Sequence, residues 1–573
     1  MNKNFYVYIS IIFIALALPP TPLRAAPPAP CTDTYIVQGT DSLSKIADKF
    51  LGNLKAFPAI VAATNQQHAT DQSYAQITNP DRIEAGWKLC VPANQVAEAL
   101  LSETAAVSPS PETPPIIAAA PYTLDDFVRE FDFGSEVKPT WIYESPPALV
   151  KGDISAEFQE AKDRYGYRAN YLWNEHLGND YFLYSGIFST PPPQVKLYKA
   201  SWGTIMPRYR YPPNATLPTG LVTNQFGWRG PAIKLDKAPG TIRIACVGAS
   251  TTVSGHSFPH SYPELLQHWL NLWAAENDYE VKFEVINAGR EGISSNDIAA
   301  VVRYEILPMD VDYVIYYEGA NQFDPRTVVS YPTEVTFGQP PEGVVPNLAN
   351  VESNDKSLLD QLSEVSALAA RARTLVEQFS MTGKEPPKPE QTFHLPAGQD
   401  EYQPNRANLG DTLALKRILG DLDTIKQELD DNEVEMLLGT FSWFAYDNMV
   451  LDPGRHRVLY GYLNRLYWPI SYANMRRAAD FQNRVFQMWA ADNGVPIIDV
   501  AGQMPRQPDL FDDAIHNKPL GIRVRAWLNF EALVPLLKQR LDQGELPRKD
   551  RVFLTEHPYI STEFYTRELT VKQ

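Results

Sequence analysis

The sequence predicts an α/β protein whose main body is a three-layer α/β/α sandwich around a parallel β-sheet, preceded by a small βααβ unit. The first observation is that short, nearly continuous apolar segments alternate with amphipathic helical patterns between residues 241 and 545. Such segments are typical of parallel strands that are covered on both faces. The second observation is a separate strand–helix–helix–strand pattern in residues 31–93. With 573 residues, the chain is also too long for one ordinary domain.

The first 25 residues have the pattern of a signal peptide. Lys3 supplies a positive charge, residues 5–18 form an apolar segment, and Pro19 begins a stretch that ends in small residues. The alternative is a retained membrane anchor, but the apolar segment is shorter than the roughly 20 residues that cross a bilayer. We therefore expect a secreted, periplasmic or cell-envelope protein whose mature chain has no integral membrane segment.

The chain is acidic, with a formal net charge of −17 that becomes −19 when Lys3 and Arg24 leave with the signal peptide. Nucleic acids and anionic lipids are bound by clustered Lys and Arg, so we expect neither as a partner. No cofactor is predicted. His256 and His260 have the spacing of a metal-binding pair, but no third ligand lies near them in the sequence, so no metal site is predicted.

The three cysteines fall into two groups. Cys31 and Cys90 lie at the two ends of the small unit, and in an exported protein we expect a disulfide between them. Cys246 lies in an apolar strand pattern, where a buried free thiol is expected rather than a catalytic one.

Residues 31–93 contain two strand patterns and two helical patterns. "TYIVQ" alternates like a strand, and "GTDSLSKIADKFLG" predicts a helix capped by Asp41 or Ser42. "PAIVAATNQ" predicts a second helix, and "IEAGWKLCVP" a closing strand. The opening "YIVQGTDSLSKIADKF" and this close resemble a LysM module, although residues 66–78 lengthen the usual connection. The resemblance implies binding to glycans that contain N-acetylglucosamine, such as peptidoglycan or chitin; the alternative is a spacer without glycan affinity.

Three further segments flank the sandwich. Residues 94–121 are rich in Ala, Pro and Ser and predict a semi-extended linker. Residues 122–240 form an accessory segment rich in Trp, Tyr and Pro, and residues 546–573 form a C-terminal tail.

Within residues 241–545, strand and helix patterns alternate. The strand patterns are "IRIACVG", "VKFEVIN", "VDYVIYYEG", "VEMLLGTF" and "VPIIDVAG"; the helical patterns between them cover residues 261–277, 294–307 and 473–494. An insertion at 325–432 interrupts this order and contains two more helical patterns, marked by Leu358 to Phe379 and by Leu415 to Leu429. Such an insertion forms either a lid or substrate wall, or a passive excursion.

Polar residues follow the first three strand patterns. Ser250 comes directly after "IRIACVGA", at the carboxyl edge of the sheet, where α/β proteins bind ligands. Gly292 and Asn321 follow the second and third strands, so the Ser250 and Gly292 N–H groups and the Asn321 amide could stabilise one oxyanion. Taken singly, these are also features of ordinary turns, and a serine is a common helix cap. The sequence around Ser250 is not the G-x-S-x-G turn of α/β-hydrolases.

After the last strand, Asp513 precedes His516 by three residues. In one tight turn, this spacing lets a carboxylate orient the imidazole of a general base. Asp512 is an alternative to Asp513. His256 and His260 are alternatives to His516 because they are close to Ser250 in the sequence.

Four segments occur in a characteristic order, each after a strand: "GAST", "NAGREG", "GANQ" and "DAIH". Together they resemble the four blocks of the SGNH (GDSL-like) hydrolase family. The resemblance implies a flavodoxin-like sandwich, with Ser250 as nucleophile, Ser250, Gly292 and Asn321 as the oxyanion hole, His516 as the base and Asp513 as its partner. Two positions depart from the family pattern, because Ala249 and Gln322 stand where the family has aspartates.

The resemblance implies an exported serine esterase that forms an acyl-Ser250 intermediate, and the LysM-like unit points to O-acetyl groups on cell-wall or extracellular glycans. One alternative is an O-acyltransferase that uses the same triad. The other is a glycan-anchored binding or scaffolding protein whose hydrolase-like body is inactive.

Overall fold

The computed structural model describes residues 31–97, 121–345 and 383–568, apart from gaps at 39–40, 54–55, 78–82, 131–139, 155–158, 161–162, 164–193, 199–206, 208, 218, 256–258, 453, 549–553, 555 and 561–563. The chain divides into two compact units, Met1–Glu112 and Thr113–Gln573. The predicted signal peptide and most of the predicted linker lie outside the described residues. Within the described ranges, we find no helix that combines the length and the apolar character needed to cross a bilayer.

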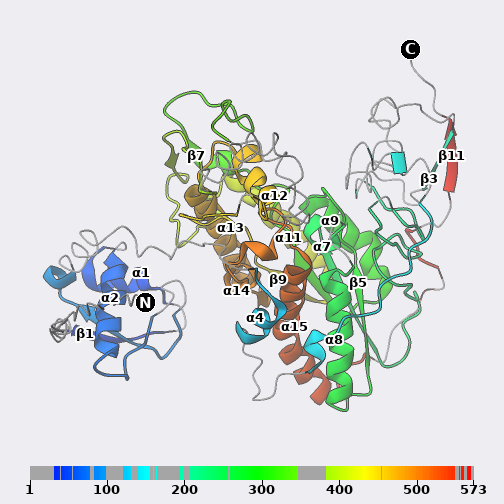
Figure 1. Cartoon of the computed structure of the whole chain (residues 1–573). Helices are drawn as coiled ribbons and strands as arrows, with labels where there is room; N and C mark the ends of the chain where they lie inside the picture. Colours follow the sequence, from blue (N-terminus) through cyan, green and yellow to red (C-terminus); the bar gives the residue numbers. More distant parts are fainter. Residues whose placement is uncertain are drawn as a thin grey trace, which may run out of the picture. The chain divides into compact units, whose positions relative to one another are not determined.

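The first unit has the βααβ order that its sequence predicts. β1 (Cys31–Ile36) and β2 (Lys88–Pro92) form an antiparallel pair, and α1 (Leu43–Leu51) and α2 (Phe57–His68) lie between them in the chain (Figure 1). Of the two predicted caps of α1, Ser42 is the one that accepts a hydrogen bond from the Lys45 N–H. Asp41 instead accepts the Tyr35 hydroxyl at 2.7 Å. The core of this unit is formed by apolar residues of both helices and both strands, among them Leu43, Ile46, Ile60 and Leu89.

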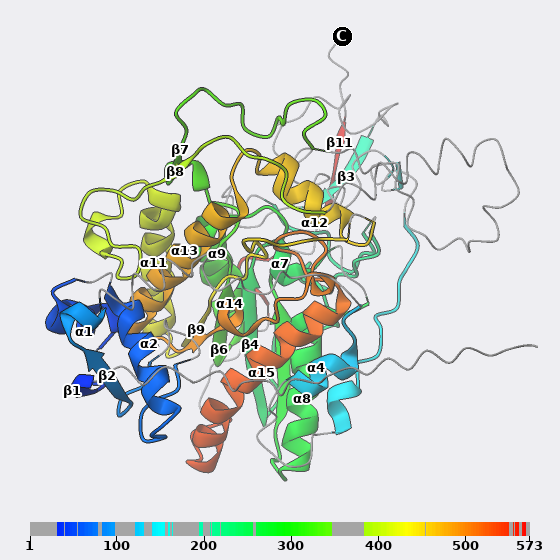
Figure 2. The ribbon, with the colours of Figure 1, turned by 60° about the vertical axis from the view of Figure 1, so that its left-hand side comes forward.

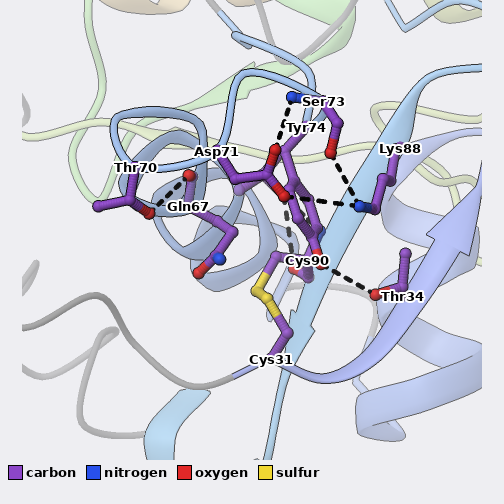
Figure 3. Close-up of a disulfide and its surroundings, with 10 residues drawn as sticks. Cys31, Thr34, Gln67, Thr70, Asp71, Ser73, Tyr74, Lys88 and Cys90 are labelled. Carbon is purple, nitrogen blue, oxygen red and sulfur yellow. Dashed lines mark hydrogen bonds and ion pairs between the residues drawn. A yellow bond between two sulfur atoms is a disulfide. The ribbon is translucent and has the colours of Figure 1, made fainter.

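A disulfide between Cys31 and Cys90 joins the start of β1 to β2, as predicted (Figure 3). Beside it, the long connection after α2 packs against the two strands. The Tyr74 hydroxyl lies 3.1 Å from the Thr34 hydroxyl, and the Lys88 ammonium lies 3.9 Å from the centre of the Tyr74 ring. These contacts fix the lengthened connection to both strands.

Replacing Cys31 and Cys90 together by serine is expected to lower the free energy of unfolding of the first unit by about 4 kcal/mol, because the bridge closes a long loop and restricts the unfolded chain. The two cysteines are 59 residues apart. Calorimetry of the double variant beside the unaltered protein measures the loss. Cys246→Ser is the matched control and should leave the first-unit transition unchanged. Three reactive thiols in the unfolded, non-reduced protein would contradict the bridge.

The second unit is built on a five-stranded parallel sheet with the order β10-β9-β6-β4-β5. Every residue of β4 and β6 is buried, which agrees with their continuous apolar sequences. In chain order the strands therefore lie 2-1-3-4-5, the flavodoxin-like arrangement. The strands are β4 (Thr241–Gly248), β5 (Lys282–Asn287), β6 (Tyr313–Tyr317), β9 (Glu435–Gly439) and β10 (Ile497–Ile498).

Helices cover both faces of this sheet, which confirms the predicted three layers. On one face α8 (Tyr262–Glu276) packs against α15 (Pro519–Asp542). On the other, α11 (Leu415–Asp431) packs against α9 (Ser295–Val301) and α13 (Tyr472–Asp492), as Figure 2 shows. The helix predicted over 294–307 continues beyond α9 as a π-helical turn, Val302–Ile306.

The C-terminal boundary of the insertion predicted at 325–432 differs in the structure. The second helix of that segment, α11, belongs to the sandwich. α11 contacts β9 and enters it directly, so it is the helical connection between β6 and β9. The other described parts of the insertion hold short 3-10 turns and the antiparallel pair of β7 (Val329–Ser330) and β8 (Thr392–Phe393). The first predicted helix, from Leu358 to Phe379, lies outside the described residues.

The accessory segment and the tail are attached to the sandwich. In the accessory segment, Trp141 packs against Trp269 of α8 and Phe530 of α15. The predicted tail contains β11 (Phe564–Glu568), which pairs antiparallel with β3 (Gln194–Tyr198) of the accessory segment. The two segments are therefore parts of one unit.

Candidate active site

Ser250 lies at the carboxyl edge of the sheet, just after β4. β4 ends at Gly248, and Ser250 is the first residue of the short helix α7 (Ser250–Val253). β4 lies between β5 and β6, so the strand order reverses here: the next strand, β5, lies on one side of β4 and the following strand, β6, on the other. Open α/β sheets bind ligands at this switch point.

The structure brings Ser250, His516 and Asp513 together in a hydrogen-bonded row. His516 Nδ1 donates to Asp513 Oδ2 at 2.7 Å, and His516 Nε2 lies 2.8 Å from Ser250 Oγ. With the Nδ1 proton directed at the carboxylate, Nε2 is the acceptor and the serine hydroxyl donates to it. The three residues are 8%, 9% and 8% exposed, so the row is nearly enclosed.

Asp513 is held as a carboxylate. Burial alone would raise the pKa of Asp513, but its interaction with His516 outweighs burial and lowers the pKa below its usual range. The N–H groups of Ile515 and His516 both donate to Asp513 Oδ1 at 2.9 Å. The side chain is therefore fixed within its own turn, and its second oxygen is directed at the imidazole.

The alternatives weighed for these roles do not occupy the row. The Asp512 backbone N–H donates to the His516 carbonyl, and it is the Asp513 carboxylate that contacts the imidazole. His260 lines a cavity of about 370 Å³ with Leu265, Leu520 and other residues. His256 lies outside the described residues.

The predicted oxyanion donors lie in loops that touch one another. Gly292 has φ +72°, a conformation that favours glycine, and a Cβ there would meet no atom within 4 Å. The Asn321 amide donates to the carbonyl of Ile293 at 2.7 Å, which ties the loop after β6 to the loop after β5. The N–H of Ser250, as the first residue of a helix, has no intrahelical acceptor.

The two residues that depart from the family pattern, Ala249 and Gln322, lie in the loops that follow β4 and β6. Ala249 precedes α7 and provides no side-chain cap. The Gln322 carbonyl oxygen accepts the N–H of Ser295 at 2.8 Å and so holds the start of α9. Neither residue contacts the Ser250–His516–Asp513 row through a described hydrogen bond.

Arg229 of the accessory segment holds the loop that follows Ser250. Its guanidinium donates to the carbonyls of Val253 and Ser254 at 3.1 and 2.5 Å, and it pairs with Glu264 at the start of α8. From α15, Arg525 donates to the Thr251 carbonyl at 2.7 Å. Two buried cations thus bind carbonyl groups in and just after the turn that presents Ser250.

Glu305 is the centre of a buried charge network behind the Gly292 loop. It pairs with Arg290, two residues before Gly292, and with Arg210 at 2.8 Å. The Trp228 indole N–H also donates to it at 3.1 Å. Burial alone would raise the pKa of Glu305, but the charges of Arg290 and Arg210 lower it to about 2.

Two tyrosines of the accessory segment add to this support. The Tyr209 hydroxyl donates to the Glu291 carbonyl at 2.8 Å, and the Tyr211 hydroxyl accepts the Glu291 N–H at 3.3 Å. The residue next to Gly292 is therefore held through both of its backbone groups.

Aromatic residues adjoin the site at the carboxyl ends of β6 and β9. Phe323 and Trp443 stack with ring centres 4.5 Å apart, and Tyr467 meets Trp443 edge-on at 5.6 Å. Burial raises the pKa of Tyr467 to about 12, and the nearby charges of Asp513 and Glu318 add to this effect. Tyr467 therefore lies close to the Ser250–His516–Asp513 row.

Several of these residues were not predicted from the sequence. Arg229, Glu305 and Tyr467 act through contacts between distant segments, which leave no periodic pattern. Glu318 could have been selected from the sequence, since it is an acidic residue directly after the buried strand β6. Cys246 is a buried free thiol as predicted, and burial raises its pKa to about 12.

The fold and the site together define a three-layer α/β protein with a serine, a histidine and an aspartate in hydrogen-bonded order at the carboxyl edge of its sheet. Among the described residues, no group of three His, Cys, Asp or Glu side chains is arranged to hold a metal ion.

No protein-family model and no curated protein matches the chain. Solved structures of similar fold include the acetyl xylan esterase AlAXEase, with 12% identity, a TM-score of 0.27, and coverage of 51% of this chain and 100% of that one. A lipase/acylhydrolase from Enterococcus faecalis has 14% identity and a TM-score of 0.26, and covers 54% of this chain and 100% of its own. Axe2, an acetylxylan esterase from Geobacillus stearothermophilus, has 13% identity and a TM-score of 0.27, and the match covers 51% of this chain and 94% of that one. These values are too low to assign an activity to this chain.

Replacing Glu305 by glutamine is expected to lower the free energy of unfolding by about 3–5 kcal/mol at pH 7, because Arg210 and Arg290 then lose their buried counter-charge. The pKa of Glu305 falls from 4.5 to about 2 on folding. Its contribution is therefore complete above about pH 5 and is lost as the pH falls from 4.5 towards 2.

Denaturant titrations of the unaltered protein and the Glu305→Gln variant between pH 7 and pH 3 measure this effect. The difference between the two should shrink at the acid end. Asp430→Asn, which removes an exposed carboxylate from α11, is the control and should change stability by less than about 0.5 kcal/mol. A difference independent of pH would contradict the assignment of the charge to Glu305.

Proposed function

We propose that the protein is a serine esterase that hydrolyses an acyl ester through an acyl-Ser250 intermediate. One observation carries the proposal: Ser250 Oγ lies 2.8 Å from His516 Nε2, while His516 Nδ1 lies 2.7 Å from Asp513 Oδ2. In this order, the imidazole can take the serine proton, and the carboxylate stabilises the imidazolium that results.

The reaction follows from these positions. Ser250 Oγ attacks the acyl carbon and passes its proton to His516 Nε2, and the carbonyl oxygen becomes an oxyanion. The N–H groups of Ser250 and Gly292 and the Asn321 amide would stabilise that charge. His516 then returns the proton to the departing alcohol, and the acyl group remains on Ser250. A water molecule, deprotonated by His516, attacks the acyl carbon and releases the acid.

Acyl transfer is the second candidate, and the burial of the site favours it. Ser250 and His516 are only 8% and 9% exposed. An acyl-enzyme shielded from water can await an alcohol, and a sugar hydroxyl would enter the second step in place of water. An inactive scaffold is the weaker alternative, because it has no need of a serine, a histidine and an aspartate in hydrogen-bonding order.

Ser250→Ala is expected to abolish hydrolysis of p-nitrophenyl acetate, with a loss in kcat of about 10³-fold or more, because no other group forms the acyl-enzyme. The rates are measured with acetate, butyrate and octanoate esters beside the unaltered protein. Thr251→Ser, next to the nucleophile, is the control and keeps its activity.

Two outcomes separate the candidates. Faster release of p-nitrophenol when an oligosaccharide acceptor is added, with acylated sugar as product, identifies a transferase. Equal rates for the Ser250→Ala variant and the unaltered protein would contradict the serine mechanism altogether.

The glycan part of the proposal rests on the first unit. Its βααβ order is that of the LysM-like pattern, and it has its own core and disulfide. We infer that it binds peptidoglycan or another glycan containing N-acetylglucosamine, and that the protein acts outside the cytoplasm on acyl groups of such a glycan. Tethering of this kind raises the local concentration of substrate without changing the active site.

The protein without its first 25 residues is expected to sediment with insoluble peptidoglycan, whereas a variant that begins at residue 122 stays in solution. Soluble N-acetylglucosamine oligomers should compete with the longer protein. Insoluble cellulose, which lacks the acetamido group, is the control matrix. Equal sedimentation of the two proteins would assign the binding to the second unit.

A further inference from the structure

Glu318 is a buried carboxylate that the proposed reaction does not use. It follows β6 directly and is 3% exposed. Its Oε1 accepts the N–H groups of Ala320 at 2.8 Å and of Asn321 at 2.7 Å. Among the described residues, none hydrogen-bonds its Oε2, which is also buried.

The turn that these bonds hold has little room to move. Gln482 of α13 donates to the Gly319 carbonyl at 2.8 Å. A Cβ on Gly319 would lie 2.7 Å from the Cβ of Phe441, closer than packed atoms allow. The turn is therefore fixed by contacts with α13 and with the loop after β9. The Glu318 carboxylate adds hydrogen bonds to two N–H groups of the same turn.

The turn ends in the side chain predicted to bind the oxyanion. Asn321 receives the Glu318 contact on its backbone N–H, and its side-chain amide donates to the Ile293 carbonyl at 2.7 Å. Ile293 adjoins Gly292. A continuous row of hydrogen bonds thus runs from Glu318 through Asn321 to the loop of the second oxyanion donor.

Burying a carboxylate carries a desolvation cost that a cation or several hydrogen bonds must offset. Burial raises the pKa of Glu318 to about 7, although the N–H groups of Asn321, Ala320 and Gly319 lower it. The ionisable groups near it are His516, Tyr316, Tyr317 and Tyr467. Stability alone therefore does not account for an acid at this position.

We propose that Glu318 is a positioning residue for the oxyanion site: by binding the N–H groups of its own turn, it holds the Asn321 amide, and through it the Gly292 loop, where the oxyanion forms. This inference rests on the proposed esterase function. Glu318 acts on the transition state through Asn321 and makes no contact with the substrate.

Glu318→Ala is expected to lower kcat for p-nitrophenyl acetate by about 10–100-fold, with KM changed by less than about threefold, because the lost interaction matters only when the oxyanion is present. Glu318→Gln keeps an oxygen acceptor of the same length and should recover most of the lost kcat. Glu318→Asp is one methylene shorter, cannot reach both N–H groups, and should remain impaired.

A double-mutant cycle with Asn321→Ala tests the route of the effect. If Glu318 acts through Asn321, the double variant Glu318→Ala/Asn321→Ala is no slower than Asn321→Ala alone. Multiplied losses, or a Glu318→Gln variant as slow as Glu318→Ala, would overturn the proposal. Should the alanine variant not fold, the aspartate and glutamine variants carry the same comparison.

Amide hydrogen exchange provides a readout that does not depend on activity. The segments 319–322 and 291–294 should exchange faster in Glu318→Asp than in the unaltered protein, and those of Glu318→Gln should not. Unchanged exchange in all variants overturns the positioning role. If a fluorophosphonate does not label Ser250, the esterase proposal is wrong. The hydrogen-exchange result still decides whether Glu318 holds the turn.

Discussion

The parallel pairing of β4 with β5 on one side and β6 on the other is the constraint on which the site depends. Because all three strands run the same way, the loops that follow them leave the sheet at one edge. The sequence therefore has only to place Ser250, Gly292 and Asn321 just after their strands for them to converge. The fourth residue comes from a distant segment: His516 is 266 residues from Ser250 and lies in the turn that precedes α15.

Buried charge ties the accessory segment to these loops. Arg210 and Arg229 are 4% and 3% exposed, and each reaches into the sandwich, where it binds a carboxylate. Removing either cation would leave Glu305 or Glu264 without a full counter-charge, which is costly in a buried site. Residues 209–229 therefore cannot separate from the sandwich without disturbing the Ser250 and Gly292 loops, and the two fold as one unit.

Local patterns were enough to predict the strands, the main helices and the order βααβ of the first unit. For the site, local patterns left Asp512, His256 and His260 open as alternatives. The resemblance of four ordered segments to the SGNH blocks selected the serine, histidine and aspartate that the structure brings together. The patterns failed where contacts are distant in the chain. The helix Leu415–Asp431 was assigned to an insertion because a long connection precedes it, and only its packing on α9 and α13 shows that it belongs to the sandwich. The pairing of β11 with β3 joins the C-terminal tail to the accessory segment, and no local pattern links two strands so distant in the chain.

Two buried glutamates near the site, Glu305 and Glu318, have different surroundings and different roles. Glu305 has a pKa of about 2 because two guanidinium groups surround it, so its charge holds segments together. Glu318 has a pKa of about 7 because burial raises it more than the backbone N–H groups that bind its carboxylate lower it, and no described cation is bound to it. The first carboxylate strengthens the fold behind the Gly292 loop. The second has no such cation among the described residues, and its hydrogen bonds hold the turn that ends at Asn321. Under the proposed esterase function, the site would need both: a scaffold that cannot shift, and a turn whose donors are directed before the charge of the oxyanion appears.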